Sequence, residues 1–416
     1  MKFIHTADIH LDSPMRGLEG YDGAPVDELR GATRRALENL VELAIDQEVA
    51  FVLIAGDVYD GEWKDVNTGL YFARQIARLG EAAIKVIVIA GNHDADSIIA
   101  RRLPLPECCI ELPTDAPATH RLEEHGVAVH GQGFRTRAVV EDLSSAYPDP
   151  VPGLLNIGLL HTSADGRPGH ANYAPCTLAG LLAKGYDYWA LGHVHQREIL
   201  NERPWVVFPG NIQGRQIREP GRKGATLVTV DDGEITNVEH RDLDVASWVV
   251  CAVDAEPLAD EADVLMAIDA GLQEALRDAA GSLLVARILV TGPSAAHGAL
   301  VSNEGGLAAA VRARAFDISA DRLWIEKVKV ETRSLIDLDE VRGREDAVGE
   351  LLRSVAALDD ARLAELSRHF ADLNAKLPHE LRNSDEPFDP TDVDTLRSII
   401  GDIEQLLLPR LTEKVE

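Results

Sequence analysis

The chain has 416 residues, 45% of them hydrophobic, and its 41 lysines and arginines against 69 aspartates and glutamates give a formal net charge of −28. This length predicts two or three domains, and the composition excludes disordered, collagen-like and disulfide-stapled proteins. The acidic balance excludes a protein that binds nucleic acid through an overall positive charge, although a local patch or a bound metal can still hold a polyanion.

The start of the chain turns polar within a few residues, and no run of about 18 apolar residues occurs, so we expect neither a signal peptide nor a membrane span. The four cysteines show no Cys-x-x-Cys spacing, which is typical of reduced thiols. These features together predict a cytoplasmic protein.

Strand-like and helix-like stretches alternate through the first hundred residues. The short stretch at 2–6 favours a β-strand, and apolar runs at 51–55 and 86–90 are typical of buried strands. Amphipathic patterns at 27–47 and 67–80 predict helices between them. Strand-like segments then follow one another, with a hairpin signal at 231–233. They lie at 127–132, 155–160, 187–191, 204–208, 225–230 and 234–239. This order predicts an α/β layered core that continues as a β-sandwich over residues 1–245.

The pattern changes near residue 246. Strand-like segments at 248–253, 283–290 and 322–331, with helix-like segments at 260–279 and 303–315 between them, predict a small α+β module over 246–335.

Residues 336–416 are mostly helical and acidic, with a linker composition at 383–390. The last helix has apolar residues on one face, at Val393, Leu396, Ile399, Ile400, Ile403, Leu406 and Leu407. This face either packs on its own domain or docks on a partner.

Residues rich in histidine, aspartate and asparagine follow five of the predicted strands. They form the motifs Asp8-x-His10, Gly56-Asp57-x-x-Asp60, Gly91-Asn92-His93-Asp94, His161 and Gly192-His193-x-His195. Because ligands bind beyond the carboxyl ends of strands in open α/β sheets, these segments can converge. Carboxylate, imidazole and amide oxygen are ligands for manganese, iron or zinc. One such pair is usually a turn or a cap, whereas all five in this order predict a metal site.

This order of motifs resembles that of the calcineurin-like metallophosphoesterases, and among them the bacterial DNA-repair exonucleases of the SbcD and YhaO type. FIHTADIHLDSP, GDVYD, AGNHD, and LGHVH followed by VVFPGNIQGR carry the likeness, which beyond residue 245 rests on architecture. The resemblance implies an α/β fold with a two-sheet αββα sandwich over 1–245. A capping module that guides DNA would follow over 246–335, and a helical tail over 336–416.

The resemblance also implies a site for two divalent metal ions. Asp8, His10 and His195 would hold one ion, and Asn92, His161 and His193 would hold the other, with Asp57 as the bridge. Manganese is the first expectation, with iron, zinc and magnesium as alternatives. Two ions held in this way can clamp both the attacking and the leaving oxygen of a phosphodiester.

His93 corresponds to the catalytic histidine of these enzymes, which stabilises the transition state or protonates the leaving oxygen. Asp60 stands where some relatives have a histidine, so it acts either as an acid or as a residue that orients His93 or a ligand. Asp94 is expected to be a helix cap or turn residue. Arg16, Arg215 and Arg218 are candidates for contacts with substrate phosphate, and a solvated loop is the alternative.

The function that the resemblance implies is a metal-dependent DNA exonuclease or endonuclease of DNA repair. Its partners would be DNA and an SbcC-like coiled-coil ATPase that binds the C-terminal region, and a homodimer is compatible with it. The chain has no GxxxxGK[ST] motif, so we expect no ATP site in it. Two alternatives stay open, since fold does not fix function. One is a phosphodiesterase for small nucleotides or lipids, and the other is a non-catalytic binding module with a vestigial metal site.

Overall fold

The computed structural model describes residues 1–13, 25–60, 65–96, 104–166, 173–378 and 388–412. The chain divides into two compact units. Unit 1 joins Met1–Val250 with Ala275–Ala286 and Ser319–Glu326, and unit 2 joins Cys251–Glu274, Arg287–Ile318 and Lys327–Glu416. The predicted module at 246–335 thus contributes to both units, and the domain boundaries at 245 and 335 stay predictions.

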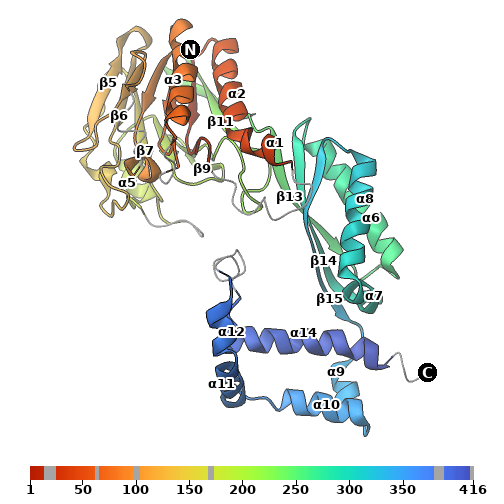
Figure 1. Ribbon diagram of the computed structural model, residues 1–416. Helices are drawn as coiled ribbons and strands as arrows, with labels where there is room; N and C mark the ends of the chain where they lie inside the picture. Colours follow the sequence, from red (N-terminus) through yellow and green to blue (C-terminus); the bar gives the residue numbers. More distant parts are fainter. Residues whose placement is uncertain (14–24, 61–64, 97–103, 167–172, 379–387, 413–416) are drawn as a thin grey trace. The chain divides into compact units, whose positions relative to one another are not determined.

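Two six-stranded sheets form the centre of unit 1 (Figure 1). The strands of the first are β1 (Lys2–Thr6), β2 (Phe51–Ile54), β3 (Lys85–Val88), β4 (Cys109–Glu111), β11 (Gly224–Asp231) and β12 (Glu234–Asp242). Their order is β12-β11-β1-β2-β3-β4, in which β1 to β4 run parallel and β11 is antiparallel to β1. This register places the carboxyl ends of β1, β2 and β3 at one edge.

The second sheet has the order β5-β6-β7-β8-β10-β9. Its strands are β5 (Ala118–Leu122), β6 (Val127–Gly131), β7 (Leu155–His161), β8 (Tyr188–Gly192), β9 (Glu198–Glu202) and β10 (Trp205–Phe208). Because β6, β7, β8 and β10 run parallel, the carboxyl ends of β7 and β8 also lie side by side.

The apolar strands are buried because each sheet is covered on both faces. Phe3 and Leu53 of the first sheet pack against Ile157 of the second. The outer face of the first sheet packs on α2 (Ala32–Asp46) and α3 (Val66–Glu81), and α5 (Leu178–Ala183) covers the second sheet. Unit 1 therefore has the predicted layers of an αββα sandwich.

Short elements account for the differences from the predicted secondary structure of unit 1. The helix expected over 27–47 is divided at Gly31 into α1 (Val26–Arg30) and α2. The strands β4, β5 and β9 and the helices α4 (Asn92–Asp96) and α5 were not predicted. Elements of three to six residues are too short to show a helical or alternating pattern in the sequence. The described part of unit 1 also contains the short 3-10 helices η2 (Glu123–His125) and η3 (Leu143–Ala146).

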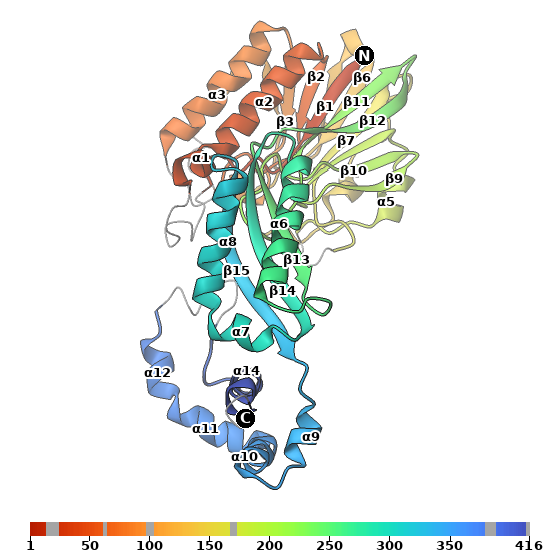
Figure 2. The same ribbon diagram turned by 90° about the vertical axis from the view of Figure 1, so that its right-hand side faces the viewer.

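Three further strands, β13 (Ala246–Asp254), β14 (Leu283–Ser294) and β15 (Leu323–Ser334), form a sheet in that order. The helices α6 (Glu261–Asp278) and α8 (Glu304–Ile318) lie along one face of it (Figure 2), and α7 (His297–Ser302) precedes α8. Ile268, Leu272, Leu307 and Val311 are the buried anchors of the two long helices. The alternation of strands and helices is the one that the sequence predicts.

Unit 2 also contains the helical C-terminal region. Its helices are α9 (Leu338–Arg342), α10 (Ala347–Ala356), α11 (Asp360–His369), α12 (Ala371–Lys376) and α14 (Val393–Thr412). The helix α14 contacts α7, α10 and α11, so Leu396 is only 4% exposed, whereas Ile403 is 45% exposed. The apolar face of α14 is thus partly covered within unit 2. In the described part of the chain, no helix is long and apolar enough to cross a membrane.

Candidate metal centre

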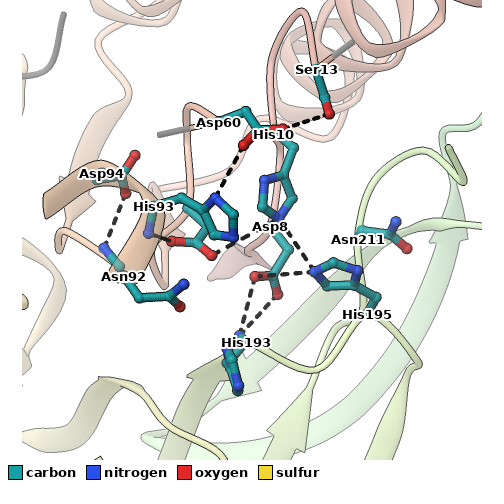
Figure 3. A network of polar contacts seen from close by, with 12 residues as sticks. Asp8, His10, Ser13, Asp60, Asn92, His93, Asp94, His193, His195 and Asn211 are labelled. Atoms are coloured by element: carbon teal, nitrogen blue, oxygen red, sulfur yellow. Dashed lines mark hydrogen bonds and ion pairs between the residues drawn. The ribbon is translucent and has the colours of Figure 1, made fainter. Parts of the chain in front are cut away.

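The polar motifs meet at one end of the two sheets of unit 1 (Figure 3). The loops after β1 and β2 lie side by side because Asp8 N donates to Gly56 O and His10 N to Asp57 O, each over 3.0 Å. The backbone N–H of His193 donates to the two Asp8 carboxylate oxygens at 3.0 and 3.2 Å, which joins the β8 loop to the β1 loop. The convergence expected from the strand ends is therefore present.

Several of these residues have a backbone conformation that residues other than glycine rarely adopt. The φ angle is positive in Asp8 (51°), His10 (43°), Asp57 (55°) and His193 (100°). Such conformations store strain, and they cluster at functional sites where the surrounding contacts hold them. The backbone at Gly192 also packs closely against the end of β2, because a Cβ atom at position 192 would lie only 2.0 Å from Ala55 O.

Asp8, His10 and His195 form one group of candidate ligands, with one ligand atom of each within 4.8 Å of the others. The Nε2 atoms of His10 and His195 are 3.2 Å apart. The Nδ1 atom of His195 lies 2.8 Å from the Glu219 carboxylate, which can only accept, so a neutral His195 ring keeps its lone pair on Nε2. Two donor atoms of one ion lie about 3.0–3.4 Å apart when each bond is about 2.1 Å long. The group therefore fits a metal ion.

A second group surrounds His161. Its Nδ1 donates to Ala55 O over 2.8 Å, so the Nε2 lone pair faces Asn92 Oδ1 at 2.9 Å and Asp57 Oδ2 at 3.5 Å. Lone pairs this close repel one another, and a shared cation removes the repulsion. The ring of His193 lies 5.2 Å from that of His161 between centroids. One ligand atom each of Asp8, Asp57 and His161 lie within 4.8 Å of one another, and the ligand role of His193 stays a prediction.

Asp57 lies between the two groups. Its Oδ2 atom is 3.9 Å from His10 Nε2 and 3.5 Å from His161 Nε2. Burial raises the pKa of both Asp57 and Asp8, and for Asp8 the neighbouring Asp57 charge raises it further. Burial lowers the pKa of His10, and that of His161 to about 3. Neutral imidazoles do not balance the negative charge of two buried carboxylates, whereas a bound divalent cation would balance it.

His93 stands beside these groups and is held by two aspartates. Its Nδ1 lies 3.1 Å from Asp60 Oδ1, and its backbone N–H donates to Asp57 Oδ1 over 2.9 Å. Burial opposes the ionised form of Asp60, but hydrogen bonds from His93 and Ser13 outweigh it and lower the pKa to about 2. Burial likewise lowers the pKa of His93, but the bond to Asp60 and the two carboxylate charges leave it raised. Asp60 is thus suited to orient His93 rather than to donate a proton.

Comparisons with known proteins agree with this geometry. Residues 1–197 match the family described as calcineurin-like phosphoesterase, and residues 248–333 match the one described as metallophosphoesterase YhaO, middle domain. Residues 1–197 are therefore similar to the calcineurin-like phosphoesterases. The resemblance inferred from the motifs is therefore confirmed.

Individual relatives are similar to part of this chain. A Bacillus subtilis (strain 168) protein named uncharacterized metallophosphoesterase YhaO is 34% identical over 258 residues. The match spans 61% of this chain and 63% of the relative, less than two thirds of its length. Among solved structures, TT1561 of Thermus thermophilus is 16% identical over 58% of this chain and 98% of that one, with a TM-score of 0.34. A dimetal phosphatase from Danio rerio is 11% identical over 56% of this chain and 93% of that one, with a TM-score of 0.35.

Asp94 connects two loops of the candidate metal centre. Its carboxylate accepts from the backbone N–H groups of Gly91 (3.0 Å), Val58 (3.2 Å) and Tyr59 (2.9 Å). Asp94 is the third residue of α4 and not the helix N-cap expected from the sequence, and its bond to the Gly91 N–H is a capping-box contact at the start of that helix. The other two bonds fix the loop of Asp57 against the loop of Asn92, which a reading of the sequence does not reveal.

The basic candidates have different places in the structure. Arg215 lies at the site, with Nη2 3.0 Å from Glu219 Oε1 and Nη1 donating to Ser13 Oγ over 3.3 Å. Arg218 is exposed on the same loop, and Arg16 lies outside the described residues. The seven predicted ligands all lie at the convergence, and their roles stay predictions.

The sequence motifs do not identify Glu219 as a residue of the site. It is 5% exposed, and although burial raises its pKa, the hydrogen bond from His195 and the charge of Arg215 leave that pKa far below the usual value. The available signal was the spacing of four residues between Arg215 and Glu219, which is too common among 69 acidic residues to single out one of them.

Proposed function

We propose that this phosphoesterase is a metal-dependent nuclease that hydrolyses phosphodiester bonds of DNA in repair. The observation that carries the proposal is the convergence of carboxylate, imidazole and amide donors around two positions, with His93 beside them. Two divalent ions, manganese by expectation, would supply the charge that neutralises a phosphate in its transition state. Asp8, His10 and His195 would hold one ion, and Asn92, His161 and His193 the other, with Asp57 shared.

The chain's own residues prepare His93 for proton transfer. Because Nδ1 of His93 is bonded to the Asp60 carboxylate, Nε2 is the ring atom that would give a proton to the leaving oxygen. Asp60 is itself held by Ser13, whose Oγ donates to Asp60 Oδ2 over 2.7 Å. The ring of His93 lies 4.9 Å from that of His10 between centroids, so the proton donor stands next to a predicted ligand.

DNA as the substrate is supported by the motif likeness to SbcD and YhaO exonucleases and by one feature of the site. The ring of Tyr173 is partly exposed and lies 5.6 Å from the ring of His193 between centroids. An aromatic ring at this position could stack on a base next to the cleaved phosphate, which a lipid substrate would not need.

For partners, we propose that an SbcC-like coiled-coil ATPase binds the C-terminal helical region. The support is the partly exposed apolar face of α14, represented by Ile403, together with the lack of an ATP-binding motif in the sequence. A homodimer and a cytoplasmic location stay predictions.

The test is cleavage of end-labelled linear DNA with added Mn²⁺, with a chelator, and with the His93→Ala variant. We expect metal-dependent shortening that His93→Ala slows by about 10²–10⁴-fold while Mn²⁺ binding is kept. The control is His120→Ala, which removes a partly exposed histidine of β5 outside the site and should cleave as the wild type does.

Two results would contradict the nuclease proposal in different ways. Hydrolysis of a model phosphodiester without cleavage of DNA would favour a phosphodiesterase for small molecules. No hydrolysis of either substrate in the presence of Mn²⁺ would favour the binding module.

A further inference from the structure

A carboxylate outside the predicted ligand set contacts a predicted ligand. Glu219 Oε1 lies 2.8 Å from His195 Nδ1, while the other ring nitrogen, Nε2, lies 3.2 Å from His10 Nε2 and 3.9 Å from Asp8 Oδ1. The two nitrogens of His195 therefore face different partners. Nδ1 faces an acceptor, and Nε2 faces the candidate ion position.

Five donors hold Glu219 in this orientation, the most distant of them Arg215 Nε at 3.5 Å from Oε2. Oε2 accepts from Asn211 Nδ2 at 2.9 Å and from the backbone N–H of Arg215 at 2.8 Å. Oε1 accepts from Arg215 Nη2 at 3.0 Å in addition to His195. Because Glu219 is buried and both of its oxygens accept hydrogen bonds, the carboxylate has little freedom to turn away from the imidazole.

The same hydrogen bonds continue to His93. Arg215 Nη1 donates to Ser13 Oγ over 3.3 Å, and Ser13 Oγ donates to Asp60 Oδ2 over 2.7 Å. Asp60 Oδ1 then lies 3.1 Å from His93 Nδ1. One continuous chain of contacts thus runs from a predicted metal ligand to the predicted proton donor.

We propose that Glu219 is a positioning residue that fixes the tautomer and orientation of His195 for one of the two metal ions. Arg215 holds Glu219 in place and ties it to the Ser13, Asp60 and His93 contacts. Arg215 therefore acts through Glu219, and the phosphate contact expected from the sequence stays a prediction. Carboxylates that orient a ligating histidine typically change metal affinity by about 10–100-fold when they are substituted. The inference rests on the proposed function, because it presupposes the two-ion site.

The test is calorimetric titration of the full-length, metal-free protein with Mn²⁺. We expect the wild type to bind two ions and Glu219→Gln to bind one as tightly as the wild type and the other about 10–100-fold more weakly. The matched control is Glu38→Gln, which alters another glutamate of unit 1 that accepts a hydrogen bond, here from the Tyr71 hydroxyl at 2.7 Å. This control should bind both ions as the wild type does.

A double-mutant cycle separates positioning from a general loss of structure. If Glu219 acts through His195, Glu219→Gln lowers Mn²⁺ affinity no further in a His195→Ala background. Thermal unfolding of the metal-free variants checks that they fold. If Glu219→Gln does not fold, Glu219→Asp takes its place, since it keeps the charge beside Arg215 but draws the carboxylate away from Nδ1.

The outcomes are distinguishable. Wild-type affinity for both ions in the folded Glu219 variant would overturn the inference, as would an equal loss of affinity with and without His195. A wild-type chain that binds fewer than two Mn²⁺ ions would overturn the two-ion site, and the inference with it.

Discussion

The three hydrogen bonds of Asp94 give a prediction whose size follows from the structure. Val58 and Tyr59 are buried, and their N–H groups and that of Gly91 donate to this one carboxylate. A buried donor that loses its acceptor costs about 1–3 kcal/mol. Asp94→Ala removes all three acceptor contacts, so we expect a loss of about 3–6 kcal/mol in the free energy of unfolding once water fills part of the space.

Asp94→Asn should cost less, because its single amide oxygen can keep the bonds that Oδ2 accepts from Val58 and Gly91. Only the Tyr59 N–H then faces an amide nitrogen and loses its acceptor, so the free energy of unfolding should fall by about 1–3 kcal/mol. Urea unfolding of the metal-free variants, followed by tryptophan fluorescence, measures both values. Asp115→Ala, an exposed aspartate of unit 1, is the control and should stay within about 0.5 kcal/mol of the wild type. Equal effects of alanine and asparagine at 94, or an alanine effect below about 1 kcal/mol, would refute the reasoning.

Three further substitutions test other parts of the structure. Asp57→Asn should weaken Mn²⁺ binding at both positions in calorimetry, and undiminished binding at either one would count against a bridging role. Gly91→Ala changes no predicted ligand, but its Cβ would lie 2.2 Å from Asp57 Oδ1, so Mn²⁺ affinity should fall. Wild-type Mn²⁺ affinity in this variant would contradict the expectation, because it would mean that the loop moves to accommodate the methyl group. Ile403→Asp should abolish co-purification with the proposed coiled-coil ATPase partner and spare hydrolysis of a model phosphodiester, whereas Leu396→Asp, at a buried position of the same helix, should destabilise unit 2. Retained co-purification of the Ile403 variant would argue against this face of α14.

The sequence predicts the site well where local chemistry coincides with a strand end. The apolar run at 51–54 stops just before Gly56 and Asp57, and parallel pairing then brings Asp57 to Asp8. The contacts of Glu219 with His195 and of Asp94 with Tyr59 could not be predicted in this way. Their partners are 24 and 35 residues away along the chain, and only the folded sheets bring them together.

The roles of the charged residues show the same limit. The basic cluster around Arg215 suggests phosphate binding when it is read as a list of charges. In the folded chain, the guanidinium of Arg215 is bonded to Glu219 and Ser13. Asp60 also gains its low pKa from His93 and Ser13, and a sequence motif does not include such partners.

The strands of the three-stranded sheet contribute residues to both units. This limits where the chain can be cut to make a stable fragment. Within unit 1, Leu29 and Ile217 pack with Trp248 and Val285, and Trp324 packs against the same cluster. A recombinant fragment that stops at residue 245 would leave the apolar surface of Leu29 and Ile217 open to water. Recombinant fragments and domain exchanges should therefore keep the chain at least as far as Glu326, since the fold of unit 1 is completed by segments encoded after the first 245 codons.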